Sequence, residues 1–302
     1  MNSNYLITII GPTAIGKTTL SIKLASYFKT EIISADSRQF YKEMSIGTAV
    51  PSKEELAAAP HHFIQHKSIF ENYSVGNFEK DALKKLEELF EKNDVVIMVG
   101  GSGLYVDAVV KGLDEFPKID ATIRLQLNQT LEKEGISALQ DKLKELDPDY
   151  ASKVDLENPH RLIRALEICI GSGIPYSSFL DNPKKKRPFK TIKVGLTADR
   201  EIVYDRINQR VDIMIGEGLI EEAETLHKHK ELNALQTVGY KELFNFFEGK
   251  WDKDFAISEI KKNTRRFAKR QFTWFKKDEA ILWFDYEQHI DTILEKIESV
   301  LD

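Results

Sequence analysis

Cysteine and long apolar runs are both scarce in this sequence. The 302 residues contain one cysteine, Cys169, which excludes a disulfide framework and a thiolate metal site. We expect Cys169 to be a small buried residue of a helix. No apolar run approaches the roughly 20 residues of a transmembrane helix, and residues 1–13 lack the basic segment of a signal peptide. We therefore expect a cytoplasmic protein without a membrane segment.

A large excess of charge of either sign is also missing. The chain has 43 Lys and Arg against 48 Asp and Glu, for a formal net charge of −5. This balance argues against indiscriminate coating of nucleic acid, but it permits a local basic face, because the distribution of charge forms a binding surface. With 42% hydrophobic and 10% aromatic residues, the chain can bury a sizeable core, so disorder is excluded.

Short apolar runs alternate with helical patterns in the first third of the chain. The runs at 5–10, 31–34 and 95–99 are typical of buried strands. Residues 18–28 and 81–92 show the spacing of helices. Strands that alternate with helices predict a parallel sheet with right-handed crossovers. We therefore predict an α/β fold with three layers.

The pattern changes beyond Gly112. Residues 119–171 are rich in charge and show helical spacing without a strand-like run. We predict an all-helical insertion over 116–189, carried by a core of residues 1–115 and 190–302. Further strands and helices of the core are predicted at 191–197, 200–216, 219–229, 258–277 and 280–284.

Residues 11–18 have the pattern of a phosphate loop, the P-loop of many nucleotide-binding proteins. Two glycines are separated by four residues and followed by Lys-Thr, between a strand and a helix. The glycines let successive N–H groups point inward, and the helix N-terminus adds partial positive charge. Lys17 can reach phosphate oxygens, and the Thr18 hydroxyl can hold Mg²⁺. The predicted diphosphate-binding residues are Gly11, Pro12, Thr13, Ala14, Ile15, Gly16, Lys17 and Thr18.

The phosphate loop does not define its ligand. An enzyme that hydrolyses nucleotides usually has an acidic residue at the end of a later strand. Here the strand at 95–99 is followed by Gly-Gly-Ser-Gly, and Asp94 lies at its other end. Asp36 follows the second strand, at the sheet edge where ligands collect in α/β folds. Its carboxylate either takes part in chemistry or caps a helix.

A set of segments, taken in chain order, resembles the tRNA dimethylallyltransferases, also called tRNA isopentenyltransferases. They are GPTAIGKT at 11–18, DSRQFY at 36–41, IGTAVP at 46–51, HHF at 61–63, VGGSGLY at 99–105, NPHRLIRALEI at 158–168, QTVGYKEL at 236–243 and TRRFAKRQFTWF at 264–275. The later motifs are not shared with P-loop proteins in general. The sequence departs from the family at Phe63 and Gln65, where leucine and aspartate are common. For His61 and His62 we expect a structural or substrate-loop role, not a metal site.

The resemblance implies a magnesium-dependent transfer of the dimethylallyl group from dimethylallyl diphosphate to the exocyclic N6 amine of the adenosine on the 3′ side of the tRNA anticodon. Asp36 matches the general base of the family, and Lys17 and Thr18 match its phosphate-binding and metal-binding positions. Arg210, in preference to Arg206, matches its catalytic arginine. The segments that match its tRNA contacts contain Asp36, Ser37, Arg38, Gln39, Ser102, Arg124, His160, Arg161, Leu162, Ile163, Arg164, Gly239, Tyr240 and Lys241.

The helix predicted at 258–277 carries basic residues at steps of three and four. Such a face is either solvated or in contact with RNA phosphates. We expect Arg265, Arg266 and Lys269 to contact the anticodon stem-loop, together with a second basic element at 184–187. The aromatic residues of the same helix are expected in the core. They are Phe267, Trp274 and Phe275.

Three other functions remain open. A relative that prenylates free adenine nucleotides would share the phosphate loop and Asp36, but it would not need the insertion or the basic helix. A P-loop kinase for a small metabolite would bind ATP. A non-catalytic RNA-binding module would need neither Asp36 nor the loop. The sequence after 275 lacks the zinc finger of the eukaryotic members, so we expect a bacterial-type enzyme, and we expect a monomer.

Overall fold

The computed structural model describes residues 4–180 and 186–301 of the chain. The chain forms two compact units, one made of Met1–Lys111 with Arg187–Asp302 and the other of Gly112–Lys186. We call the first the core unit and the second the helical unit. The sequence pattern places the same two divisions a few residues further along, before residue 116 and after residue 189.

The core unit is built on a sheet whose described strands are all parallel, in the order β3-β2-β4-β1-β5-β6. The strands are β1 (Tyr5–Ile10), β2 (Ile32–Ser34), β3 (His61–His62), β4 (Val95–Val99), β5 (Lys190–Thr197) and β6 (Ile281–Asp285). This confirms the predicted parallel α/β sheet. The sequence pattern does not predict β3, because two histidines are too few and too polar to show strand spacing.

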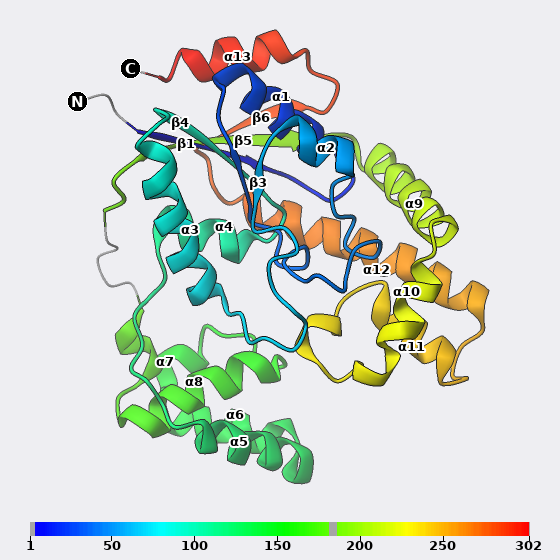
Figure 1. Ribbon diagram of the computed structural model, residues 1–302. Helices are drawn as coiled ribbons and strands as arrows, with labels where there is room; N and C mark the ends of the chain where they lie inside the picture. The colour runs from blue at the N-terminus through cyan, green and yellow to red at the C-terminus, as the bar shows by residue number, and fades with distance from the viewer. Residues whose placement is uncertain (1–3, 181–185, 302) are drawn as a thin grey trace. The chain divides into compact units, whose positions relative to one another are not determined.

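Helices cover both faces of this sheet. They include α1 (Lys17–Phe28), α2 (Lys53–Ala58), α3 (Val75–Phe90), α4 (Gly103–Lys111) and α13 (Ile290–Glu298). Ile7 and Ile9 of β1 belong to the apolar core shared with α1 and α13, whereas Leu6 and Ile10 belong to the core under α3 and α4. Figure 1 shows α1 and α13 above the sheet and α3 and α4 below it. The three predicted layers are therefore confirmed.

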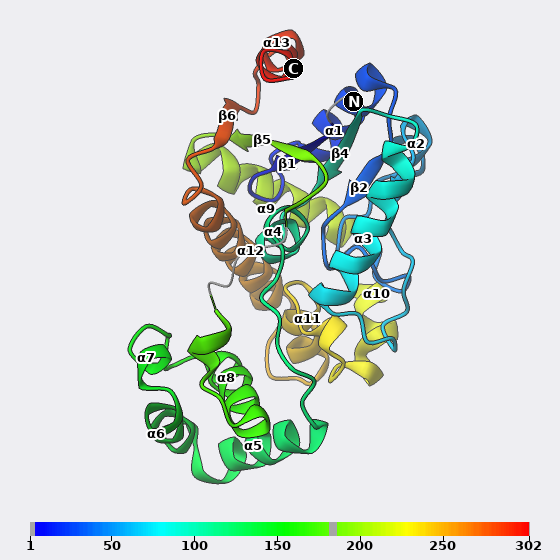
Figure 2. The same ribbon diagram turned by 90° about the vertical axis from the view of Figure 1, so that its left-hand side faces the viewer.

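A second group of helices packs together after β5. It consists of α9 (Arg200–Gly216), α10 (Leu219–Leu226), α11 (Tyr240–Phe247) and α12 (Lys253–Phe275). Figures 1 and 2 both show α11 beside the N-terminal half of α12, with α10 next to α11. Asn263 of α12 donates a hydrogen bond to Glu242 of α11 at 2.8 Å, and Arg265 donates one to Asn208 of α9 at 2.6 Å. The group thus joins the segment at 236–243 to the basic helix.

The buried stripe of α12 differs from the predicted one. Phe275 is buried, but Phe267 and Trp274 are 38% and 42% exposed, so the prediction that they are core residues was wrong. Ile260, seven residues before Phe267 and so on nearly the same face of the helix, is buried. The exposure of Phe267 therefore depends on what α12 meets along its length and not on helical spacing. The positions near 267 and 274 that are buried are Ala268 and Gln271.

No helix in the described part of the chain is long and apolar enough to cross a membrane.

The helical unit has a core of its own. Its helices are α5 (Ala121–Glu134), α6 (Ile136–Leu146), α7 (Pro148–Ala151) and α8 (Pro159–Ser172), followed by the 3₁₀ turn η1 (Tyr176–Phe179). Leu127, Leu139, Leu143 and Leu162 form the centre of its apolar core. Cys169 is buried in α8, as predicted, and burial raises the pKa of its thiol. The all-helical prediction for this segment holds over its described residues.

Candidate active site

The loop between β1 and α1 has the shape of a phosphate cradle. Gly11 has φ 140°, and a Cβ there would lie 2.5 Å from the carbonyl oxygen of Leu196, so only glycine fits. Ala14 and Gly16 also have positive φ, at 64° and 104°. The loop therefore turns tightly and delivers the chain to the first residue of α1, where the helix N-terminus leaves backbone N–H groups unbonded within the helix.

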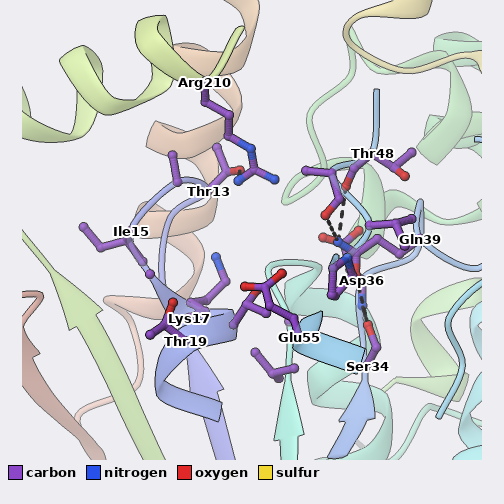
Figure 3. Close-up of a pocket in the computed structure, with 18 of the residues that line it drawn as sticks. Thr13, Ile15, Lys17, Thr19, Ser34, Asp36, Gln39, Thr48, Glu55 and Arg210 are labelled. Carbon is purple, nitrogen blue, oxygen red and sulfur yellow. Dashed lines mark hydrogen bonds between the residues drawn. The ribbon is translucent and has the colours of Figure 1, made fainter. Parts of the chain in front are cut away.

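Three side chains from distant parts of the sequence hold this loop. Arg206 Nε donates to the Ala14 carbonyl at 2.8 Å, and Arg210 Nη1 donates to Thr13 Oγ1 at 3.4 Å. Gln271 Oε1 accepts from the Thr13 N–H at 2.9 Å. The two arginines of α9 thus differ. Arg206 fixes the loop backbone, whereas Arg210 reaches the loop from the cavity side (Figure 3).

Lys17 is enclosed beside the loop that carries it. Its ammonium donates to the Pro12 carbonyl at 2.7 Å. The pKa of Lys17 is lowered to about 8, mainly by burial; the negative charge of Asp36 opposes this change, and the positive charge of Arg210 adds to it. Burial also lowers the pKa of Arg210, again against the charge of Asp36. Two cations therefore share a poorly solvated space, which an anionic ligand would stabilise.

Asp36 lies just beyond β2 and is held by its own turn. Its Oδ1 accepts from the Arg38 N–H at 3.1 Å, and its N–H donates to Ser34 Oγ at 3.4 Å. Its Oδ2 accepts no hydrogen bond from the described residues, so this oxygen remains available to a ligand. The Arg38 guanidinium points elsewhere and donates to the carbonyls of Asn233 and Ala234, each at 3.0 Å.

Gln39 connects this turn to the next segment of the chain. Its Nε2 donates to the carbonyls of Thr48 and Ala49 at 3.2 and 2.9 Å. Its Oε1 accepts from Ser34 Oγ at 3.3 Å, the same hydroxyl that receives the Asp36 N–H. Since both ends of its amide are bonded within the protein, Gln39 supports the wall of the loop cavity.

Two cavities meet at these residues. The loop cavity, of about 480 Å³, is lined by the phosphate loop and by residues of 48–51. The helix cavity, of about 580 Å³, is lined by residues of α11 and α12. Four residues line both, and they are Thr13, Asp36, Thr48 and Arg210. Figure 3 shows Lys17 and Arg210 on one side of the loop cavity and Asp36, Gln39 and Thr48 on the other.

The donor atoms around the loop cavity suit a magnesium ion that is held mainly by phosphate oxygens and water. The Thr18 hydroxyl and the Asp36 carboxylate both line this cavity. Within residues 4–180 and 186–301, no group of three or more His, Cys, Asp or Glu could hold a metal by itself. Mg²⁺ prefers oxygen donors and is commonly bound through one or two side chains together with phosphate oxygens and water. The residues present fit that mode.

Several residues of the predicted tRNA-contacting segments come together in the core unit. The Ser37 and Ser102 hydroxyls lie 3.1 Å apart, and both residues line the helix cavity with Gly239 and Lys241. Tyr240 is completely buried, so its side chain cannot reach RNA. Gly239 and Lys241 of this motif thus lie at the cavity, whereas its central aromatic residue packs in the core.

The basic face of α12 is present. Arg266 and Lys269 are exposed, whereas Arg265 is partly buried between Asn208 and the ring of Tyr204. Arg266 and Lys269 are thus more accessible to RNA phosphates than Arg265.

The second basic element does not present the expected charge at its end. Arg187 is 10% exposed, pairs with Glu79 at 2.5 Å and donates to the Ala108 carbonyl at 2.6 Å. It therefore belongs to the core unit. Residues 184 and 185 lie outside the described residues.

In the helical unit, two of the predicted RNA-contacting arginines converge on one carboxylate. Arg124 and Arg164 donate to Glu167 Oε2 at 2.7 and 3.2 Å. Burial would raise the pKa of Glu167, but these two cations lower it below its usual value. Both guanidiniums are half-exposed and keep further donors for a ligand.

Other predicted contacts of α8 divide between surface and core. His160 and Arg161 are exposed at the N-terminus of the helix. Leu162 and Ile163 are buried, so their side chains stabilise the unit and cannot contact RNA.

The two adjacent histidines of β3 have different partners, and His61 also lines the loop cavity. His61 Nδ1 lies 2.7 Å from a backbone carbonyl two residues earlier, and His62 Nε2 lies 2.6 Å from Glu31. The two rings thus have separate partners. Gln65, which departs from the family pattern, donates to Ser45 Oγ at 2.7 Å and so joins this segment to the one at 45–51.

Sequence reasoning did not find two polar residues at the site. Gln271 holds the phosphate loop from α12, and Glu222 of α10 accepts from the backbone N–H groups of residues 45–47. A polar residue on the buried stripe of α12, four residues before Phe275, is a signal for Gln271. Glu222 gives no such signal, because a glutamate at the start of a helix is ordinary.

The fold and site define an α/β enzyme in which a glycine-bearing loop and two cations face a carboxylate across one cavity. The family model for IPP transferase matches residues 39–278. The tRNA dimethylallyltransferase of Christiangramia forsetii is 66% identical over 99% of both chains, and that of Flavobacterium johnsoniae is 63% identical over 97% of each. The chain belongs to this family of tRNA dimethylallyltransferases, a family of prenyl transferases.

Solved structures agree with this assignment. The tRNA isopentenylpyrophosphate transferase of Bacillus halodurans is 38% identical, with a TM-score of 0.72 over 98% of this chain and 95% of that one. A eukaryotic dimethylallyltransferase acting on tRNA is 27% identical, with a TM-score of 0.80 over 98% of this chain and 78% of that one.

Proposed function

We propose that this protein transfers the dimethylallyl group of dimethylallyl diphosphate to the N6 amine of the adenosine on the 3′ side of the tRNA anticodon. The observation that carries the proposal is the shared lining of the two cavities. Thr13, Asp36, Thr48 and Arg210 face both. A donor in the loop cavity and an acceptor in the helix cavity would therefore meet at these residues.

The donor side neutralises the leaving group. The loop amides and Lys17 bind the diphosphate, and Lys17 exchanges the Pro12 carbonyl for a phosphate oxygen. Arg210 points toward the same space and stabilises the negative charge that develops as the C–O bond breaks. Thr18 would help to hold Mg²⁺, which supplies further positive charge next to the diphosphate.

The acceptor side removes a proton. An exocyclic adenine amine is a weak nucleophile because its lone pair is delocalised into the ring. Asp36 Oδ2 accepts a proton from the amine as the new N–C bond forms, and the electron pair of the broken C–O bond leaves with the diphosphate. The hydrogen bond from the Arg38 N–H to Oδ1 fixes the carboxylate for this role.

The acceptor is an RNA loop in this proposal, for two reasons. Arg266 and Lys269 expose positive charge on α12, which also lines the helix cavity. The target base must leave its stack to enter the cavity, at a cost of a few kcal/mol, and a single-stranded loop keeps that cost low. A free nucleotide would need neither the basic face nor the helical unit.

A transfer assay tests the proposal directly. Labelled dimethylallyl diphosphate and Mg²⁺ are supplied with an anticodon stem-loop, with the same stem-loop lacking the target adenosine, or with AMP. Label in the intact stem-loop alone is the expected result. Label in AMP would indicate a nucleotide acceptor instead. Absence of label in all three, with phosphate transfer from ATP to a metabolite, would indicate a kinase.

A further inference from the structure

Gln271 links two segments of the site that are far apart in sequence. It lies on α12, is 6% exposed, and uses both ends of its amide. Its Oε1 accepts from the Thr13 N–H at 2.9 Å, and its Nε2 donates to the Gly101 carbonyl at 3.0 Å. An amide is the neutral side-chain group that can accept at one end and donate at the other, so carboxylate or hydrocarbon cannot replace both bonds.

The space for this amide depends on a glycine. A Cβ at Gly101 would lie 2.1 Å from Gln271 Nε2, a distance that forces the amide to move. The glycine segment that follows β4 therefore has a use other than phosphate binding. It lets α12 approach closely enough for one side chain to span from the Gly101 carbonyl to the phosphate loop.

The contact lies at the residue that separates the two cavities. Thr13 lines both cavities, and its hydroxyl also accepts from Arg210. Because the Thr13 N–H donates to Gln271, this backbone group does not point at a phosphate. The cradle therefore consists of the backbone N–H groups that follow Thr13. Thr13 is thus held from one side by Gln271 and from the other by Arg210, which sets the direction of the loop.

We infer that Gln271 is a positioning residue that fixes the phosphate loop at Thr13 and ties the loop to α12, the helix that carries the basic face. The inference rests on the proposed function, since it takes the loop as the diphosphate site. Gln271 itself touches no substrate. Removal of the Gln271 amide should weaken diphosphate binding and leave the exposed charges of Arg266 and Lys269 in place.

Three variants separate this role from ordinary packing. Gln271→Leu removes both hydrogen bonds and puts an apolar side chain of similar size in place of the amide. Gly101→Ala displaces the same amide without changing the sequence of α12. It tests the same contact if Gln271→Leu fails to fold. Thr273→Ala is the matched control, because Thr273 is exposed on the same helix and its hydroxyl bonds to the Lys269 carbonyl within that helix.

The experiment compares inorganic diphosphate with RNA. Calorimetric titration of Mg²⁺-diphosphate should give a Kd about tenfold higher for Gln271→Leu and Gly101→Ala than for the wild type, the loss typical of one misdirected hydrogen-bonding group. The KM for dimethylallyl diphosphate should rise by a similar factor, with kcat changed less than the KM. Thr273→Ala should match the wild type, and the Kd for an anticodon stem-loop should stay within about twofold for every variant.

The outcomes distinguish the two proposals. Wild-type protein that does not bind diphosphate would contradict the loop assignment itself. Equal diphosphate binding by the wild type and Gln271→Leu would overturn the positioning role and leave the loop assignment intact. A variant that melts at lower temperature but binds diphosphate normally would show that Gln271 only stabilises the fold, which also overturns the inference.

Discussion

The hydroxyl of Tyr240 donates a hydrogen bond of 2.7 Å to Oε1 of Glu222. Tyr240 is completely buried, and burial together with Glu222 raises the pKa of its phenol. The same carboxylate accepts three backbone N–H groups, those of residues 45–47, at 2.8 to 2.9 Å. Glu222 thereby joins α10 and α11 to the segment whose next carbonyls, at 48 and 49, support Gln39.

Glu222→Ala should therefore destabilise the protein far more than Tyr240→Phe. The first change leaves three N–H groups and a phenol without their acceptor, which we expect to cost about 3 kcal/mol or more. The second removes one hydroxyl and should cost about 1 kcal/mol. Urea denaturation measures both, with Glu224→Ala on the exposed face of α10 as the control. Equal losses for the two variants would mean that the carboxylate does not hold the segment at 45–47.

Asp36→Asn tests the base without changing the turn. The asparagine oxygen can still accept from the Arg38 N–H, but the side chain can no longer take a proton. We expect kcat to fall by about 10² to 10⁴, with a Kd for the stem-loop close to the wild type. Single-turnover transfer and equilibrium binding are the measurements. Turnover at the wild-type rate would remove Asp36 from the proton-transfer step.

The fold could be read from the sequence because its signals are local. The runs at 5–10 and 95–99 are fully buried strands, and the Gly-x₄-Gly-Lys-Thr spacing lies between β1 and α1 as expected. Each of these features is contained in a short window of sequence. The exposed aromatics of α12 show the limit of such reasoning, since Phe267 has apolar character but its environment depends on what α12 meets.

The supports of the site could not be read in the same way. Thr13 and Gln271 are 258 residues apart, and Gly47 and Glu222 are 175 apart. Within its own helix, each polar side chain resembles an ordinary surface residue. Only the folded arrangement brings Gln271 to the Thr13 N–H and Glu222 to the Gly47 N–H. Motif comparison finds residues that touch substrates more readily than residues that hold those motifs in place.

Lys17 predicts a pH dependence of donor binding. Its pKa of about 8, with Asp36 and Arg210 as the charged groups that face it, means that its charge is lost as the pH rises through 8. If diphosphate binds the protonated form, the KM for dimethylallyl diphosphate should rise roughly fivefold between pH 8 and pH 9. Lys17→Arg keeps its charge over this range and should give a much flatter profile. A wild-type KM that is constant from pH 7 to 9 would contradict the prediction.

The same group should affect stability with a definite sign. The folded-state pKa of Lys17 lies below the unfolded value of 10.5, so the unfolded chain binds more protons between about pH 8 and 10.5. The contribution of Lys17 to the free energy of unfolding should therefore increase with pH in this window. Comparing denaturation of the wild type and Lys17→Met across it isolates the effect, since the methionine variant lacks the titrating group.

Reversing charge on α12 should weaken RNA binding in a salt-dependent way. Arg266→Glu with Lys269→Glu replaces two exposed cations on the helix that lines the helix cavity. If each contacts one phosphate, the slope of log Kd against log salt should fall by roughly 1.4 to 1.8, and the Kd at low salt should rise at least about tenfold. Lys23→Glu, exposed on α1 across the sheet, changes charge without touching this face and should bind as the wild type does. Unchanged affinity of the double variant at low salt would mean that the basic face of α12 is only solvated and that other residues contact the RNA. Arg124 and Arg164 of the helical unit would then be tested first, because their guanidiniums keep free donors beside Glu167.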